Sequence, residues 1–152
     1  MGLALFYHLT RSPVEQTVPQ ILGRALGQNL RVHVRGRAAD RMDWLDQRLW
    51  LEGEASFLPH GVKGGPHDDL QPVLLCTDAT VPPDGTCLMA IDGAEVRPAD
   101  CEGRDRVWIL FDGNDPAALD IARQQWKTLT DAGVSAQYWS EESGRWQKKT
   151  EK

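Results

Sequence analysis

Three nearly continuous apolar runs limit the folds that are open to this chain of 152 residues. They read "QPVLLCTD" (71–78), "TCLMAIDG" (86–93) and "RVWILFDG" (106–113). A strand with one face in water alternates apolar and polar residues, whereas an unbroken apolar run is typical of a strand covered on both faces. The three runs therefore predict strands of a parallel sheet that has helices on both sides.

The other elements alternate between strands and helices. Further strands are predicted at "LALFYHL" (3–9), "LRVHVRG" (30–36) and "VSAQYWSE" (134–141). Helical spacing of apolar residues predicts helices over 12–28, 38–50 and 114–133. This order predicts a single α/β domain with a mostly parallel sheet flanked by helices.

The first and last helices carry terminal signals. Ser12 is expected to cap the first helix, with Pro13 at its first position and Glu15 completing a capping box. Pro19 lies inside the same pattern, so we expect it to kink the helix or to shift its start. The last helix is predicted to be capped by Asn114 or Asp115, opened by Pro116 and stopped by Gly133.

Two segments lack an ordinary secondary-structure pattern. "SFLPHG" (56–61) is too short and too interrupted for an ordinary element, and "GVKGGPHDD" (61–69) is predicted to be a loop from its composition. The end of the chain, 141–152, is polar and is predicted to be a frayed tail. No repeat or composition break divides the rest, so one domain is expected over 1–140.

Charge and composition exclude several classes of protein. The formal net charge is −5, which disfavours direct, sequence-specific or general binding to nucleic acid, because that affinity comes mainly from Lys and Arg. No apolar run reaches the roughly 18 residues of a membrane span, and the first residues do not read as a secretory signal. Three cysteines without close pairing favour a reducing compartment, so a cytoplasmic protein is expected.

Known catalytic and cofactor motifs do not fit this chain. A dinucleotide fingerprint requires G-x-G-x-x-G directly after the first strand, but the sequence there is "TRSPVEQ" (10–16). A Walker loop requires G-x-x-x-x-G-K-[ST], which "GVKGGPHD" (61–68) does not match. The cysteines and histidines lack metal-site spacing, and no G-x-S-x-G elbow is present. We therefore expect no cofactor, no metal site and no catalytic residue.

An α/β enzyme or nucleotide-binding protein remains the alternative. Asp92 and Asp112 end two of the apolar runs, and open parallel sheets bind ligands at the carboxyl ends of their strands. The simpler interpretation is that both aspartates form turns with the glycines that follow them.

Several short motifs occur in the same order along this chain as in a known protein family. They are Phe6-Tyr7 with Leu9, Val14-Glu15-Gln16, "LDxxLW" (45–50), "SFxPH" (56–60), and Ala122-Arg123 followed by Trp126-Lys127 and Ala132-Gly133. In this combination, from about residue 3 to 135, the chain resembles the chi subunit family of bacterial DNA polymerase III holoenzyme. The resemblance implies a nucleotide-binding-like topology without a phosphate-binding loop. It also implies a non-catalytic accessory role.

The resemblance further implies two kinds of partner. One is the clamp loader of the polymerase holoenzyme, reached through a small psi subunit or its functional replacement. The other is single-stranded DNA-binding protein, whose acidic C-terminal tail ends in Pro-Phe with a free carboxylate.

The expected tail-binding site lies on and after the last helix. The family's basic tail-binding residue falls on Arg123 and its aromatic residue on Trp126. Lys127 lies one turn beyond Arg123, and the predicted site also includes Gly133, Tyr138 and Trp139. Arg grips a carboxylate with two parallel hydrogen bonds. The alternatives are that Arg123 and Lys127 form a solvated helix face and that Trp126 is plain core.

A second predicted surface serves psi or another partner. The resemblance places Phe57 of "SFxP" at the psi-facing surface, and the prediction adds Pro59 beside it. It also adds Phe111 and Asp112 at the end of the third apolar run. The alternative for Phe57 is a core-filling side chain, because Phe is commonly buried.

Overall fold

The computed structural model describes residues 3–11, 13–51, 60–63, 72–77, 82, 85–102, 104–141 and 146–151. The strands are β1 (Leu3–Leu9), β2 (Arg31–Arg35), β3 (His60–Val62), β4 (Val73–Cys76), β5 (Thr86–Ala90), β6 (Arg106–Asp112), β7 (Ala136–Ser140) and β8 (Gln147–Glu151). The helices are α1 (Val14–Gly27), α2 (Ala39–Leu51), α3 (Pro98–Cys101) and α4 (Pro116–Asp131).

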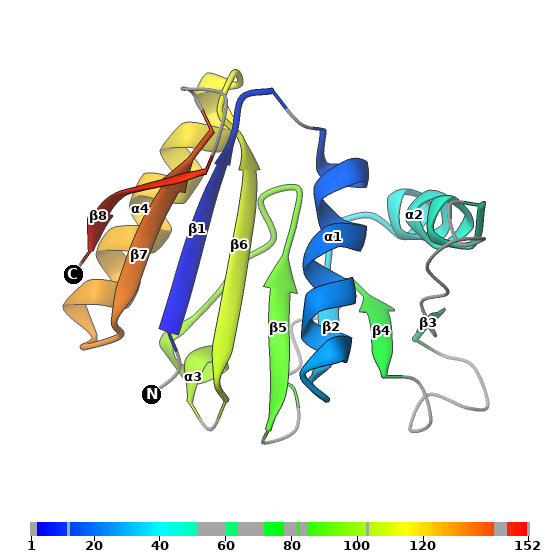
Figure 1. The fold of residues 1–152 in the computed structure, drawn as a ribbon. Helices are drawn as coiled ribbons and strands as arrows, with labels where there is room; N and C mark the ends of the chain where they lie inside the picture. The colour runs from blue at the N-terminus through cyan, green and yellow to red at the C-terminus, as the bar shows by residue number, and fades with distance from the viewer. Residues whose placement is uncertain are drawn as a thin grey trace.

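These strands form one sheet in the order β3-β4-β2-β5-β6-β1-β7-β8 (Figure 1). All neighbouring strands are parallel except β7 and β8, which are antiparallel. Every residue of β4 and β5 is buried, as the unbroken apolar runs predict for strands covered on both faces. The predicted α/β domain with a mostly parallel sheet is confirmed.

Helices cover both faces of the sheet, with α1 and α4 on opposite sides (Figure 1). On one face, Leu22 of α1 and Leu45 of α2 pack in a core cluster with Val32 and Val34 of β2. On the other face, Leu129 of α4 packs in a second cluster that includes Phe6 and Ile109. Successive residues of one strand therefore reach different cores, which decides which side chains line the site described below.

The start of α1 differs from the sequence prediction. The helix begins at Val14, Pro13 occupies the N-cap position, and no side chain caps it; Ser12 lies outside the described residues. The helix continues through Pro19, so its start is not shifted. An internal proline costs about 3 kcal/mol, and the burial of Val18, Ile21 and Leu22 against the sheet offsets that cost.

Three short elements were not predicted. β3 lies in a segment expected to be a loop, and its pairing with β4 makes it an edge strand. β8 lies in the tail expected to fray, where it pairs with β7. The third is the four-residue helix α3. Backbone hydrogen bonds to a neighbouring strand stabilise both strands. Such bonds do not require alternating apolar side chains, so the sequences of β3 and β8 do not reveal them.

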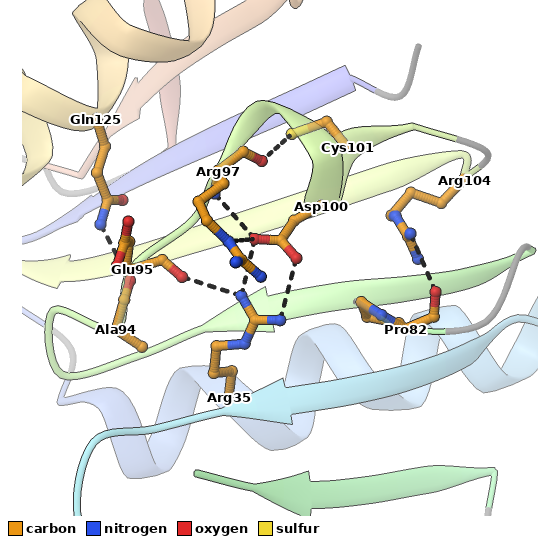
Figure 2. Close-up of polar contacts among 9 residues, drawn as sticks. All are labelled: Arg35, Pro82, Ala94, Glu95, Arg97, Asp100, Cys101, Arg104 and Gln125. Atoms are coloured by element: carbon orange, nitrogen blue, oxygen red, sulfur yellow. Dashed lines mark hydrogen bonds and ion pairs between the residues drawn. The ribbon is translucent and has the colours of Figure 1, made fainter. Parts of the chain in front are cut away.

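A buried ion pair ties β2 to α3 (Figure 2). Nη1 and Nη2 of Arg35 donate to the two carboxylate oxygens of Asp100 at 3.0 and 3.2 Å, and Nη1 also donates to the carbonyl of Glu95. The backbone N–H of Arg97 donates to Asp100 at 2.9 Å. Burial raises the pKa of Asp100, but the hydrogen bonds from Arg35 and Arg97 bring that pKa below its ordinary value of 3.8. Asp100 is therefore charged and fully engaged at neutral pH.

Two further buried side chains hold loops through backbone carbonyls (Figure 2). Arg104 donates to the carbonyl of Thr86 at 2.7 Å and to that of Pro82 at 3.2 Å. Nε2 of Gln125 on α4 donates to the carbonyl of Ala94 at 3.0 Å. The Gln125 contact fixes α4 against the segment that follows β5, and the Arg104 contacts hold the residues at and before the start of β5.

The three cysteines are buried and form no disulfide with one another. Burial raises the pKa of Cys87, and burial together with the charge of Asp100 raises the pKa of Cys101 to about 11. Because the thiolate is the reactive form, we expect Cys101 in the native protein to react about 100-fold more slowly with a thiol reagent than in the unfolded chain. Counting modified thiols before and after denaturation tests this expectation. Rapid native labelling of Cys101 would contradict it.

Candidate functional site

An apolar groove with a basic rim lies where α4 meets β7 and β8. Its volume is about 420 Å³, which falls within the range of small-ligand sites. The lining residues come from four elements and are Phe111, Leu119, Ala122, Arg123, Trp126, Tyr138, Lys149 and Thr150. We call this cavity the α4 groove.

Aromatic rings give the α4 groove a fixed wall. Trp126 is half-buried and meets the buried ring of Phe6 edge to face, with 5.2 Å between ring centroids. It meets Tyr138 in the same way at 6.2 Å. Aromatic pairs at such distances add about 0.5–1.5 kcal/mol beyond the burial of their area. Trp126 thus packs partly on the core and partly forms the groove wall.

The side chain of His8 fixes the orientation of Tyr138. Its hydroxyl lies 2.8 Å from Nδ1 of His8, in a hydrogen bond. The His8 ring stacks on Phe111, with 5.3 Å between centroids. A Cβ added to Gly113 would overlap that His8 ring. The absence of a side chain at Gly113 therefore makes the space for the ring that holds Tyr138.

The rim of the α4 groove is positively charged. The Arg123 side chain is 74% exposed and lies 3.7 Å from the carboxylate of Asp120, which is itself 70% exposed. Exposed pairs of this kind contribute roughly 0–1 kcal/mol, so Asp120 competes weakly with an incoming anion. Lys149 supplies a second cation from β8. The arrangement suits an apolar group that carries a carboxylate.

The structure brings together only part of the predicted tail-binding set. Arg123, Trp126 and Tyr138 all line the α4 groove. Lys127 is exposed on α4 but does not line the groove, and Gly133, at φ +91°, ends the helix.

Trp139 lies on the other side of the sheet. It packs against the core beneath α1, beside Trp146. Adjacent strand residues point to opposite faces, so Tyr138 and Trp139 cannot both face the α4 groove.

Of the four residues predicted for a second partner, the structure describes Phe111 and Asp112. Phe57 and Pro59 lie outside the described residues. Phe111 is buried and lines the α4 groove. Asp112 is exposed and lines a separate crevice at the carboxyl ends of β1 and β6.

That crevice has a volume of about 660 Å³. It lies at the carboxyl ends of parallel strands, which is where an α/β enzyme or nucleotide-binding protein, the alternative function, would bind its ligand. Both aspartates of that alternative line it and have structural contacts. Asp92 accepts a hydrogen bond from Nε of Arg41 at 3.0 Å, and Asp112 accepts the backbone N–H of Asn114 at 2.9 Å. The predicted turn role of Asp112 is thus present in the structure.

Sequence reasoning missed Lys149 and Thr150 as groove residues. Both lie on β8, whose polar sequence "QKKTE" was predicted to fray. The only signal in the sequence is a pair of adjacent lysines, Lys148 and Lys149, and charge alone does not reveal on which face of a strand they lie.

Within the part of the chain that the structure describes, no helix is long and apolar enough to cross a membrane. The same residues contain no group of three His, Cys, Asp or Glu side chains placed to hold a metal ion. The α4 groove is the strongest candidate among the described cavities, because Arg123, Lys149 and the rings of Trp126 and Tyr138 line the same cavity.

Comparison with known proteins identifies a family for this chain. No curated protein matches the chain significantly. A family model described as "DNA polymerase III chi subunit, HolC" matches residues 1–137. The matched segment covers the sheet from β1 into β7, together with the four helices that the structure describes. The chain therefore belongs to the DNA polymerase III chi subunit (HolC) family.

Proposed function

We propose that this chain is a non-catalytic subunit that links the clamp loader of DNA polymerase III to single-stranded DNA-binding protein. Membership of the chi family gives it an accessory role in DNA replication. In the proposed interaction, the acidic C-terminal tail of single-stranded DNA-binding protein binds in the α4 groove. The observation that carries the proposal is the convergence of Arg123 and an aromatic wall on one apolar volume.

The chemistry of the tail matches the α4 groove in two respects. The terminal Phe ring requires an apolar slot, which Ala122, Trp126 and Tyr138 provide. Its carboxylate requires a nearby cation, and the exposed guanidinium of Arg123 is able to form two parallel hydrogen bonds with it. Lys127, one helical turn beyond Arg123, adds long-range attraction for the acidic residues upstream. Gly133 and Trp139 contribute by ending α4 and by fixing β7.

The second part of the proposal concerns the clamp loader. We assign its contact, through psi or a functional replacement, to Phe57 and Pro59, with Asp112 as a further contact. Phe111 belongs by position to the α4 groove. We propose that the protein acts in the cytoplasm, where the replisome works.

Replacing Arg123 with alanine is expected to weaken binding of the tail peptide at least about 30-fold, the usual effect of truncating an arginine that anchors a partner. Folding is expected to be unchanged, because the Arg123 side chain is mostly exposed. Fluorescence anisotropy of a labelled tail peptide measures the affinity, and thermal unfolding measures stability.

Two controls make this experiment decisive. A peptide without its terminal Phe is expected to lose binding to the wild-type protein. Lys148→Ala removes a charge from β8 on the side away from the α4 groove, so it is expected to bind almost normally. If wild-type protein binds neither peptide, or if Arg123→Ala binds as wild type does, the proposed site is wrong.

A further inference from the structure

The pairing of β8 with β7 is irregular at one residue. Tyr138 lies opposite Thr150, and Trp139 lies opposite Lys148, so the register shifts between these pairs. Lys149 stands between Lys148 and Thr150 without an opposite residue on β7. One extra residue in one of two paired strands is a β-bulge, and bulges redirect side chains.

This bulge determines which side chains of β8 face the α4 groove. Directly paired residues project to the same side of a sheet. Thr150 therefore lies on the side of Tyr138, which is the groove side, whereas Lys148 lies on the side of Trp139. Strict alternation would send Lys149 away from the groove, yet both Lys149 and Thr150 line it. The extra residue thus places two consecutive side chains at the groove.

The two neighbouring lysines also differ in their partners. Lys148 lies 3.6 Å from the carboxylate of Glu151. The ammonium of Lys149 has no ion pair or hydrogen bond with any residue that the structure describes. Arg123 shares its charge with Asp120. Among the described residues, Lys149 is therefore the groove-lining cation without a carboxylate partner.

We propose that Lys149 is a second anchor for the tail of single-stranded DNA-binding protein, pairing with a tail carboxylate at the β8 side of the α4 groove. The inference rests on the proposed function of that groove. It extends that function to a residue outside the segment 1–137 that the family model matches. A tail bound in this way has its carboxylates next to two cations, Arg123 from α4 and Lys149 from β8.

Anisotropy of the labelled tail peptide tests the inference on three variants. Lys149→Ala is expected to weaken binding roughly fivefold, as expected for the loss of one partly exposed ion pair. Lys148→Ala removes the same charge one residue away and is expected to change affinity less than about twofold, because Lys148 lies on the other side of the sheet. The long-range effects of the two charges are nearly equal, so the difference between the two variants measures the direct contact of Lys149. Lys149→Arg is expected to retain affinity, and thermal unfolding of each variant reports whether β8 remains paired.

A second peptide with an amidated C-terminus identifies the carboxylate. If Lys149 pairs with the terminal carboxylate, Lys149→Ala and wild type bind the amidated peptide equally. If it pairs with an upstream acidic side chain, the fivefold difference persists. Equal affinities of Lys149→Ala and Lys148→Ala for the unmodified peptide, with wild type binding normally, would overturn the inference and leave the proposed function intact. Failure of the wild-type protein to bind would instead refute the proposed function.

Discussion

Replacing Asp100 with alanine is expected to lower the free energy of unfolding by about 3–5 kcal/mol, the usual cost of removing one partner from a buried ion pair. The side chains of Arg35 and Asp100 are 3% and 0% exposed. Without the carboxylate, the Arg35 guanidinium stays buried and still donates to the carbonyl of Glu95, but it loses the negative charge of Asp100 (Figure 2). The N–H of Arg97 also loses its acceptor. Urea denaturation at neutral pH measures the change.

The stability difference between wild type and Asp100→Ala is expected to depend on pH. Because the pKa of Asp100 is lower in the folded chain than its ordinary value of 3.8, its stabilising contribution is present above that value. The contribution is lost as the pH falls through the lower, folded pKa. The stability difference between wild type and Asp100→Ala should therefore be constant near neutral pH and should shrink in strong acid.

Asp43→Ala is the matched control for this experiment. Asp43 is exposed on α2, and exposed substitutions usually change stability by less than about 0.5 kcal/mol. A loss below about 1 kcal/mol for Asp100→Ala, similar to that of a typical surface substitution, would show that the ion pair does not hold α3 to β2.

The second large effect is expected from Gly113→Ala. An added Cβ would overlap the ring of His8, which is enclosed between Phe111 and Tyr138. Overpacking of this kind costs about 1–3 kcal/mol, and the lost hydrogen bond between His8 and Tyr138 costs about 1 kcal/mol more. Because Tyr138 lines the α4 groove, affinity for the tail peptide should fall together with stability.

Gly23→Ala separates this steric effect from a general effect of replacing glycine. Gly23 lies within α1, and a Cβ added there meets nothing within 4 Å. Alanine in a helix interior is about 1 kcal/mol more favourable than glycine, so Gly23→Ala should be neutral or stabilising. Paired thermal unfolding and anisotropy measurements test both variants. Wild-type stability and affinity in Gly113→Ala would contradict the proposed support of Tyr138 by His8.

The sequence predicted the elements whose stability depends on their own side chains. The apolar runs became β4, β5 and β6, because strands covered on both faces require apolar side chains throughout. The cap and start of α4 were also predicted, since Asp115 accepts the N–H of Ala117 and Pro116 opens the helix. β3 and β8 were missed because pairing with a neighbouring strand, which no local pattern records, stabilises them.

The candidate site was predictable to a similar degree. Helical spacing and the family resemblance placed Arg123 and Trp126 together, and the structure has both at the α4 groove. The sequence prediction put both Tyr138 and Trp139 in the site, whereas the structure has them on opposite faces of the sheet, and the register of β7 with β1 decides which of them lines the groove. Lys149 was not predictable, because a bulge shifts the alternation on which sequence reasoning depends.

The lysine-bearing strand β8 has a consequence for how copies of this protein behave at high concentration. It lies at the edge of the sheet beside β7 and uses the backbone groups that β7 would otherwise expose. Unpaired strand edges invite other chains to add to the sheet, and lysines on a short outer strand oppose such growth. With Lys148 and Lys149 on its outermost strand, this edge is protected against strand-by-strand aggregation while still presenting a cation to a specific peptide.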